Sequence, residues 1–428
     1  MSLPLLQHLT EQLAGAPPDA LCVAFSGGPD STALLHALAA LPHEHGLRAI
    51  HVDHALHADS AQWANHARTF CAALDVPCTV LRVTVNRGAG RGIEAAAREA
   101  RYAALAATLA PGERLLTAHH RDDQVETVLL KLLRGAGPEG LGGMRERRPL
   151  GAGELWRPLL ALPRSVLRDY LQAHALICLD DPANADLRLG RNQLRREILP
   201  RLTTHWPHAT DAITHSAALC RDAADALRGQ WLPAFDVLHD PRSGSLDATG
   251  WRALAPALRE PLLDHWLHAR GLPAPGRAQR AQIDRQLDAR AGRVPCIRWP
   301  GTELHVWKNR LWALPPAPAI DADWEAPWSG QPLALPDGGT LTLDGTLAEP
   351  LTVRLRRGGE QLKPAGDRHT RELRDLFQQA VLPPWQRAAC PMIHEGDTLI
   401  AVGDRWLTAR GVALLGAPGE RLRWRPGS

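Results

Sequence analysis

The sequence has little of what marks secreted or membrane proteins. Its seven cysteines are scattered, their number is odd and no CxxC pair occurs, so neither a disulfide framework nor a zinc ribbon is indicated. No apolar run reaches transmembrane length, and the opening stretch MSLPLLQHLTEQL lacks the basic segment and apolar core of a signal peptide. We therefore expect a cytoplasmic protein with no membrane partner.

An excess of charge of one sign is also missing. The net charge is only +3, so the balance of the whole chain neither demands nor excludes a nucleic-acid partner, and local clusters must decide. With 428 residues, the chain is too long for one typical domain, and two or three are expected.

The first third of the chain alternates segments typical of strands and of helices. This alternation predicts an α/β fold, a doubly wound parallel sheet covered by helices on both faces. Sheets of this kind bind ligands at the carboxyl ends of their strands. The expected strands are Leu21–Ser26, Arg48–Asp53, Thr79–Val85 and Arg114–Ala118, and the expected helices are Ser31–Leu41, Ser60–Leu74 and Ile93–Leu109.

The rest of the chain predicts a mainly helical middle domain and a small α+β C-terminal domain. Residues 164–292 are mainly helical in pattern, and a hairpin is expected around Lys308-Asn309. A Pro- and Ala-rich connector, LPPAPAIDADWEAPW, indicates a boundary, and short strands with one helix near Arg371–Gln379 follow it. The predicted domains are 1–210, 211–330 and 331–428.

The stretch FSGGPDS follows the first expected strand. Backbone N–H groups of Gly27 and Gly28 can approach phosphate oxygens, the next helix offers its positive end, and Ser26 and Ser31 can donate hydroxyls. Asp30 can hold Mg²⁺ that bridges phosphates. The lysine of a Walker loop is missing. The alternative is a glycine-rich turn in which Asp30 caps the helix, but the complete string after an apolar strand favours a phosphate–magnesium site.

Two motifs would lie near this loop. His51-Val52-Asp53-His54 ends the second expected strand and would be weak evidence alone. In EAAAREARY, Glu94, Arg98 and Arg101 fall on one helix face. That face is either solvated or presents two guanidinium groups to phosphates or to an acidic ligand.

A third motif, HHRDDQVET, follows the fourth expected strand. Asp123 and Glu126 have the spacing of a capping box, which is the alternative reading. The two histidines suggest a metal site, but three well-spaced nitrogen or sulfur ligands are not evident. Carboxylates at this density suit Mg²⁺ or a cationic amine. The GxGxxG within RGAGPEGL follows a helix, so it is a poor dinucleotide motif.

SGGxDS after the first strand resembles the PP-loop of N-type ATP pyrophosphatases, which cleave ATP between the α- and β-phosphates. That resemblance explains the missing lysine, because this loop would hold the departing pyrophosphate. With HVDH, AREARY, HHRDDQVET and RGAGPEGL, the chain resembles the tRNA(Ile)-lysidine synthetase family. The segments DPAN at 181–184 and RNQLR at 191–195 match that family too, with Ala183 in place of the usual Ser. The late segment LPPWQRAACPMIHEGDTLIAVG resembles its last domain.

The resemblance implies an enzyme that uses ATP and Mg²⁺ to join free L-lysine to the wobble cytidine of tRNA(Ile) with a CAU anticodon. The C2 oxygen is adenylated, pyrophosphate leaves, and the lysine ε-amine displaces AMP to give lysidine. The implied ATP-binding residues are Ser26, Gly27, Gly28, Pro29, Asp30, Ser31 and His54. The implied catalytic residues are Asp30, Asp122, Asp123, Arg98 and Arg101, with Asp30 and Asp123 as metal ligands. The lysine-binding candidates are His119, Asp122, Asp123 and Glu126.

Local basic clusters favour contact with RNA. Residues 188–201 hold five arginines and one glutamate, and residues 354–374 hold seven basic and three acidic residues. The tRNA-binding candidates are Arg191, Asn192, Arg195, Arg356 and Arg357. The sequence leaves the oligomeric state open, a homodimer included.

Three other functions agree less well with the sequence. A tRNA-thiolating relative would rely on catalytic cysteines, but Cys71 and Cys78 lie outside the motifs. A synthetase that forms amides on small molecules would leave the basic C-terminal region unexplained. A non-catalytic RNA-binding protein would not need intact Asp30, Asp122 and Asp123.

Overall fold

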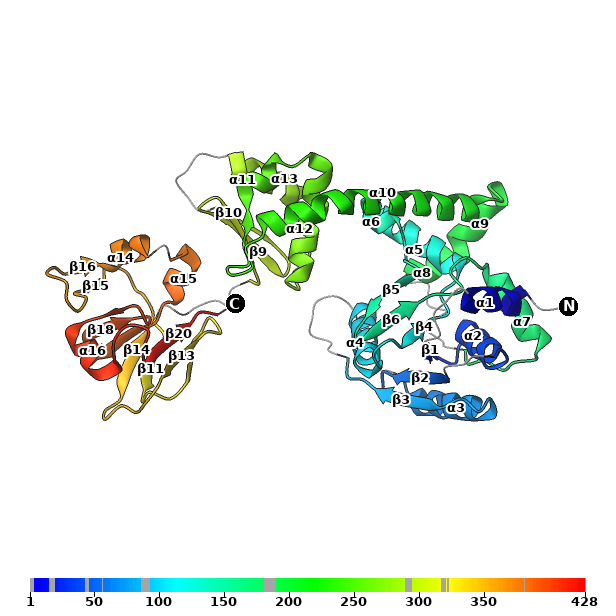
Figure 1. Cartoon of the computed structure of the whole chain (residues 1–428), viewed down its shortest axis with the longest axis horizontal. Helices are drawn as coiled ribbons and strands as arrows, with labels where there is room; N and C mark the ends of the chain where they lie inside the picture. The colour runs from blue at the N-terminus through cyan, green and yellow to red at the C-terminus, as the bar shows by residue number, and fades with distance from the viewer. Residues whose placement is uncertain are drawn as a thin grey trace. The chain divides into compact units, whose positions relative to one another are not determined.

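The computed structural model describes residues 4–14, 20–42, 46–55, 57–85, 93–180, 190–288, 295–316, 321, 323–380 and 382–427. The chain divides into two compact units, Met1–Ala226 and Leu227–Ser428 (Figure 1). Helix α10 (Ala209–Leu238) contains the point of division. In the described part of the chain, no helix is both long and apolar enough to cross a membrane.

The first unit is built on the predicted sheet. Its strand order is β3-β2-β1-β4-β6-β5, and every pairing is parallel except that of β5 with β6. The four strands expected from the sequence are confirmed, with ends that differ by a few residues. The strands are β1 (Leu21–Ala24), β2 (Leu47–Asp53), β3 (Cys78–Arg82), β4 (Arg114–Leu116), β5 (Arg147–Leu150) and β6 (Gly153–Trp156).

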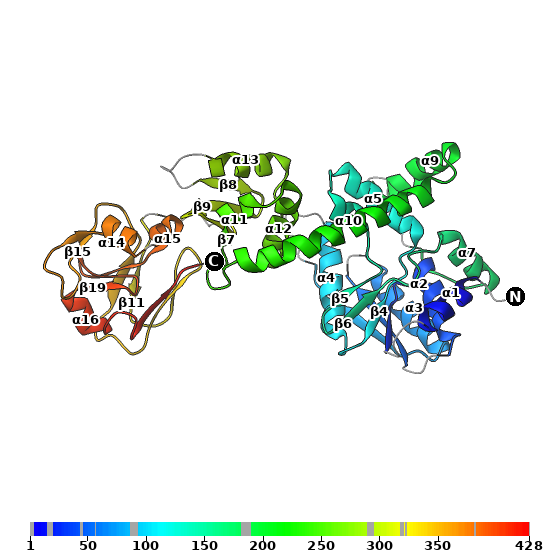
Figure 2. The ribbon, with the colours of Figure 1, turned by 45° about the horizontal axis from the view of Figure 1, so that its top comes forward.

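Helices cover both faces of this sheet, as the alternation predicts. Leu21 and Val23 of β1 point into a core shared with α1, α2, α3 and α7, whereas Cys22 points into a second core beneath α4. In both views α4 lies across the sheet from α2 (Figures 1 and 2). The helices are α1 (Pro4–Ala14), α2 (Pro29–Ala39), α3 (Ser60–Ala73), α4 (Ile93–Thr108), α5 (Arg121–Leu133), α6 (Pro138–Leu141), α7 (Arg164–Ala173), α8 (Gly190–Gln193), a π-helical turn (Leu194–Ile198) and α9 (Leu199–His205).

The second unit begins with helices packed on a four-stranded sheet of order β7-β10-β9-β8. The predicted hairpin is confirmed: Lys308 and Asn309 join β9 to β10 with φ of 47° and 61°. Positive φ at both central residues matches the right-handed twist of the strands. The elements are β7 (Leu246–Asp247), α11 (Ala248–Ala253), α12 (Pro256–Ala269), α13 (Arg277–Asp288), β8 (Cys296–Trp299), β9 (Thr302–Trp307) and β10 (Arg310–Leu314).

The last hundred residues have an apolar core of their own, which includes Trp328, Phe377 and Trp424. The expected helix near Arg371 begins only at Leu373, because Arg371 and Glu372 pair with β15 as a short strand. The elements are β11 (Glu325–Trp328), β12 (Leu333–Ala334), β13 (Thr340–Leu343), β14 (Leu351–Arg354), β15 (Gln361–Leu362), β16 (Arg371–Glu372), α14 (Leu373–Gln379), α15 (Pro384–Ala389), β17 (Met392–Glu395), β18 (Thr398–Val402), β19 (Trp406–Leu407), α16 (Ala409–Leu415) and β20 (Leu422–Arg425).

Candidate active site

The glycine-rich loop leaves β1 at its carboxyl end, and Gly27 determines its shape. Gly27 has a φ of +81°, and a Cβ at this position would lie 2.6 Å from Cδ1 of Leu179. The Gly27 carbonyl accepts hydrogen bonds from the Leu179 N–H at 2.9 Å and from the Thr32 hydroxyl at 3.2 Å. A residue with a side chain would therefore be strained by its backbone and would clash with Leu179.

The two serine hydroxyls close the loop. Ser31 Oγ donates to the Gly28 carbonyl at 3.0 Å and lies 3.0 Å from Ser26 Oγ, which accepts from the Gly28 N–H at 3.3 Å. Gly28 is the N-cap of α2, Pro29 follows it, and Asp30 lies in the first turn. The alternative in which Asp30 caps the helix is therefore wrong, because Gly28 holds that position.

His120 is completely buried between carboxylates. Its Nε2 lies 3.6 Å from Asp30 Oδ2 and 3.4 Å from Asp123 Oδ2, and its Nδ1 lies 3.7 Å from Asp122 Oδ2. Burial lowers the pKa of His120, but the three carboxylates outweigh this and raise it above the ordinary value. Burial likewise opposes ionisation of Asp30, yet His120 and nearby arginines, with Arg164 first among them, hold the pKa of its carboxyl below the ordinary value. The site thus concentrates opposite charges out of water.

The capping box at the start of α5 is formed by His120 and Asp123, three residues earlier than the spacing suggested. Asp123 Oδ2 accepts from the His120 N–H at 3.1 Å, and the Asp123 N–H lies 3.4 Å from His120 Nδ1. The alternative that Asp123 and Glu126 form this box is wrong. Glu126 is consequently available for another role.

Glu126 is fully buried and held by two arginines from the RNQLR segment. It accepts from Arg191 Nε at 2.8 Å and from Arg195 Nε at 2.6 Å, and Arg195 also donates to Asp123 Oδ1 at 2.9 Å. Arg195 lies in the π-helical turn, a distortion often found at functional sites. Two lysine-binding candidates, Asp123 and Glu126, thus share one ion-pair network with two tRNA-binding candidates, Arg191 and Arg195. Asn192, a further tRNA-binding candidate, lies between these two arginines in the sequence, and its side chain is buried.

Arginines gather around Tyr102 on the neighbouring helix α4. The guanidinium carbons of Arg98 and Arg101 lie 5.3 and 5.6 Å from the centre of its ring, and that of Arg148 lies at 5.4 Å. Within the described part of the chain, no ion pair is formed by Arg98 or Arg101. Burial, reinforced by Arg98 and Arg191, lowers the pKa of Arg101. This cluster is suited to bind an anion.

His119 and His54 border the same region. Burial lowers the pKa of His119 to about 3. Asp123 opposes this shift, whereas three nearby arginines reinforce it, so the imidazole is neutral. Burial, with Arg101, also lowers the pKa of His54, whose Nδ1 is buried without a hydrogen-bond partner in the described structure. Both rings can accept or donate a hydrogen bond without carrying charge.

Three family models match the chain: a PP-loop domain over residues 2–202, a TilS substrate binding domain over 246–312 and a TilS substrate C-terminal domain over 351–424. The tRNA(Ile)-lysidine synthase of Xanthomonas campestris pv. campestris (strain 8004) is 45% identical over 424 residues, which are 96% of this chain and 97% of the relative. This chain belongs to the tRNA(Ile)-lysidine synthase family. The Pseudomonas aeruginosa member is 41% identical over 426 residues, 95% of this chain and 93% of that protein.

Among solved structures, the U34-tRNA thiolase of Methanococcus maripaludis matches with a TM-score of 0.44 and 15% identity, over 51% of this chain and 78% of that chain. This likeness is too small to support an argument. Family membership rests on the models and relatives above, and with it the use of ATP that a PP-loop domain implies.

Two residues at the site, Arg164 and Leu179, could not be predicted from the sequence. Arg164, at the start of α7, places its Nε 3.6 Å from Asp30 Oδ1, and its backbone N–H donates to Asp122 Oδ2 at 2.9 Å. Leu179 packs against Gly27 of the glycine-rich loop. No spacing links either residue to the loop, since each meets it only through the fold. The DPAN motif at 181–184 lies outside the described residues.

The remaining tRNA-binding candidates lie in the second unit. Arg356 Nε is 3.5 Å from Glu360 Oε2, and its guanidinium lies 5.5 Å from the Phe377 ring centre. Arg357 Nη2 is 3.4 Å from Asp323 Oδ1, and both side chains are largely exposed. Trp385 is half-buried against His305, Trp307 and Trp312. Its ring therefore packs within the unit.

Proposed function

We propose that this chain ligates free L-lysine to C2 of the wobble cytidine of tRNA(Ile) with a CAU anticodon, and that ATP is converted to AMP and pyrophosphate. The observation that carries the proposal is that Asp30 of the SGGPDS loop and Asp123 meet at His120, with Glu126 joined to Asp123 through Arg195. The names of the relatives, tRNA(Ile)-lysidine synthase, support the product. The enzyme acts in the cytoplasm, where tRNA is modified.

ATP binds at the loop from Ser26 to Ser31, with His54 beside the nucleoside. The N-terminal end of α2 and the close backbone approach at Gly27 favour anionic phosphate. Arg98 and Arg101 are positioned to neutralise phosphate or the carboxylate of lysine. Adenylation forms a bond between the cytidine C2 oxygen and the α-phosphorus and breaks the bond to the departing pyrophosphate.

The residues fit Mg²⁺. Asp30 Oδ1 is buried without a hydrogen-bond partner in the described structure, and oxygens of Asp30 and Asp123 approach the same atom of His120. Hard oxygen donors of this type are those that Mg²⁺ prefers. When bound, Mg²⁺ would supply neutralisation of the phosphate charge that develops as pyrophosphate leaves.

The lysine amine is assigned to Asp123 and Glu126, with Asp122 and His119 at the border. Arg191 and Arg195 hold these carboxylates in the present structure, so an incoming ammonium group must take the place of a guanidinium. Once deprotonated, the ε-amine attacks C2 of the adenylated cytidine and AMP leaves. The released arginines can then contact RNA phosphate, which is the role expected of this segment from the sequence.

We assign the tRNA contacts outside the site to Arg356 and Arg357 within a C-terminal domain, residues 331–428. The family models over 2–202, 246–312 and 351–424 support a division into domains at about residues 210 and 330. Lysine, ATP and tRNA would then meet in the first domain, while the last one holds the body of the tRNA.

Pyrophosphate release is the test. It should require tRNA, and mass spectrometry of the tRNA should show one added lysyl group on the wobble cytidine. Norleucine, which lacks the ε-amine, should give no product. Incorporation of sulfur or ammonia would assign the chain to another reaction, and pyrophosphate release without any tRNA would overturn the proposal.

A further inference from the structure

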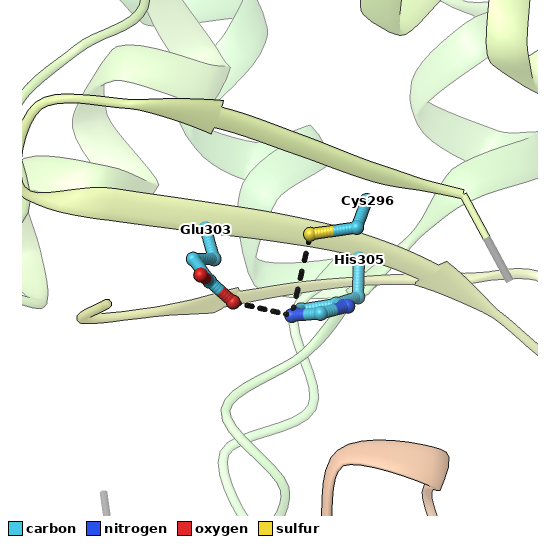
Figure 3. Close-up of side chains that lie close together, drawn as sticks. All are labelled: Cys296, Glu303 and His305. Carbon is cyan, nitrogen blue, oxygen red and sulfur yellow. Dashed lines mark hydrogen bonds and ion pairs between the residues drawn. The ribbon is translucent and has the colours of Figure 1, made fainter. Parts of the chain in front are cut away.

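Three side chains capable of binding a metal, none of them part of the proposed active site, gather on the β8–β9 hairpin of the second unit. Cys296 on β8 pairs directly with His305 on β9, and Glu303 precedes His305 by two residues, so all three project from one face of the sheet. Figure 3 shows the thiol and the carboxylate converging on the imidazole.

The separations of the imidazole nitrogen from the other two ligand atoms match those of a zinc site. Nε2 of His305 lies 3.8 Å from Sγ of Cys296 and 3.3 Å from Oε2 of Glu303, and all three atoms lie within 4.8 Å of one another. Zinc bond lengths of about 2.3 Å to sulfur and about 2.0 Å to nitrogen and oxygen, at tetrahedral angles, place nitrogen about 3.6 Å from sulfur and about 3.3 Å from oxygen. The two observed separations agree with these values to within a few tenths of an ångström, and Sγ and Oε2, which lie within 4.8 Å, would approach to about 3.5 Å on binding.

We propose that Cys296, Glu303 and His305 bind a zinc-class divalent cation, with water as the fourth ligand. Sulfur and imidazole donors favour Zn²⁺ over Mg²⁺ or Ca²⁺, which prefer oxygen. The thiol proton passes to solvent as the Sγ–metal bond forms.

The surroundings of the three residues suit this assignment. Arg298 Nε donates to Oε1 of Glu303 at 2.7 Å, which is the oxygen that does not face His305. Arg298 can therefore keep its contact and orient the carboxylate while Oε2 binds the metal. The Trp385 ring lies 4.6 Å from the imidazole, and His305 is buried, which limits access of water. Among the described residues, no other three histidine, cysteine or carboxylate side chains place one ligand atom each within 4.8 Å of both others.

The test is metal binding by the full-length protein after chelation and dialysis. Zn²⁺ should bind at one equivalent, and Co²⁺ should give intense visible bands of four-coordinate geometry with a sulfur-to-cobalt charge-transfer band in the near ultraviolet. Cys296→Ser should abolish the charge-transfer band and weaken binding at least about tenfold. Glu303→Gln, which keeps the shape of the side chain, should weaken binding by about tenfold.

Cys220→Ser is the matched control, because it removes a half-buried thiol in α10 of the first unit and should leave both spectra unchanged. Circular dichroism checks that each variant is folded. Absence of stoichiometric binding by the wild type would overturn the proposal. So would an unchanged cobalt spectrum in Cys296→Ser, or a Zn²⁺ affinity unaffected by Glu303→Gln.

Discussion

The two ends of the parallel sheet both carry buried charge, but they satisfy it differently. At the amino ends, Glu113 is met by one arginine: Arg48 donates from Nε at 2.5 Å and from Nη2 at 2.7 Å, and the Ala110 N–H adds a bond at 2.9 Å. At the carboxyl ends, Asp30, Asp123 and Glu126 share His120, Arg191 and Arg195 among them.

The hydrogen bonds of the carboxylates differ in the same way. Asp30 Oδ1, His120 Nε2 and Arg164 Nε are all buried at the carboxyl end without a hydrogen bond in the described structure, whereas both Glu113 oxygens are bonded. A completed ion pair stabilises the fold, while incomplete and shared contacts cost stability and leave groups that a ligand can satisfy. The role of a charged cluster therefore depends less on its composition than on the number of partners that each of its atoms has.

The largest effect should come from removing the incompletely bonded carboxylate. Asp30→Ala should reduce the rate of pyrophosphate release by on the order of a thousandfold, because a contact to developing charge is lost. The free energy of unfolding should change by less than about 1 kcal/mol, since no core packing is removed. Single-turnover kinetics and urea unfolding measure the two quantities. A folded variant with the wild-type rate would refute the assignment.

Disrupting the ion pair between Glu113 and Arg48 should lower the stability of the fold without lowering activity. Glu113→Gln should lower the free energy of unfolding by about 2 kcal/mol, less than for a fully buried pair because Arg48 is partly exposed. Activity per folded molecule should not change. A loss of activity as large as that of Asp30→Ala would contradict the contrast between the two ends of the sheet.

The same variant has a defined pH dependence. Burial opposes ionisation of Glu113, but Arg48 and the Ala110 N–H outweigh it, and the pKa of Glu113 is lowered by folding. The stability that this carboxylate contributes is therefore present above its unfolded pKa and is lost as pH falls through its folded pKa. Urea unfolding should show that the difference in unfolding free energy between wild type and Glu113→Gln is full at neutral pH and smaller below about pH 4.

The lysine substrate should be able to replace Arg195 as a partner of Asp123 and Glu126. Arg195→Gln removes a competitor for Asp123 and Glu126, so the KM for lysine should fall about fivefold, equivalent to about 1 kcal/mol. The KM for tRNA should rise if the released guanidinium contacts RNA. Steady-state kinetics with each substrate varied separately distinguish these effects. Arg48→Gln is the control, because that arginine lies at the opposite end, and a higher KM for lysine in Arg195→Gln would contradict the exchange.

The smallest effect is expected from an exposed pair of the second unit. Arg357→Gln should change the unfolding free energy by less than about 0.5 kcal/mol. The KM for tRNA should rise about two- to threefold at moderate salt and less at low salt, because one phosphate contact is lost. Arg410→Gln, which removes an exposed arginine paired with Glu395, serves as control. Equal effects of the two variants would point to general charge and not to a contact of Arg357.

Much of the fold could be predicted from local patterns. Apolar runs bounded by glycine and charged residues located β1, β2, β3 and β4, and the Lys308-Asn309 pair located the hairpin. The sequence did not reveal that His120 and Asp123, rather than Asp123 and Glu126, close the capping box. Both spacings are the same, and only the point at which the helix begins separates them.

The sequence was enough to predict that a lysine-free glycine loop follows a buried strand and that acidic and basic motifs follow other strands. Backbone preference and apolar periodicity are local, so they can be read from neighbouring residues. Tertiary structure alone decided which charges meet. Glu126 reaches Arg191 and Arg195 across 65 and 69 residues, and Asp30 reaches Arg164 through the packing of α7 on α2. Strand register likewise brought Cys296 to His305. Such pairings depend on crossovers and register, which are set by burial of the whole core and by no single segment.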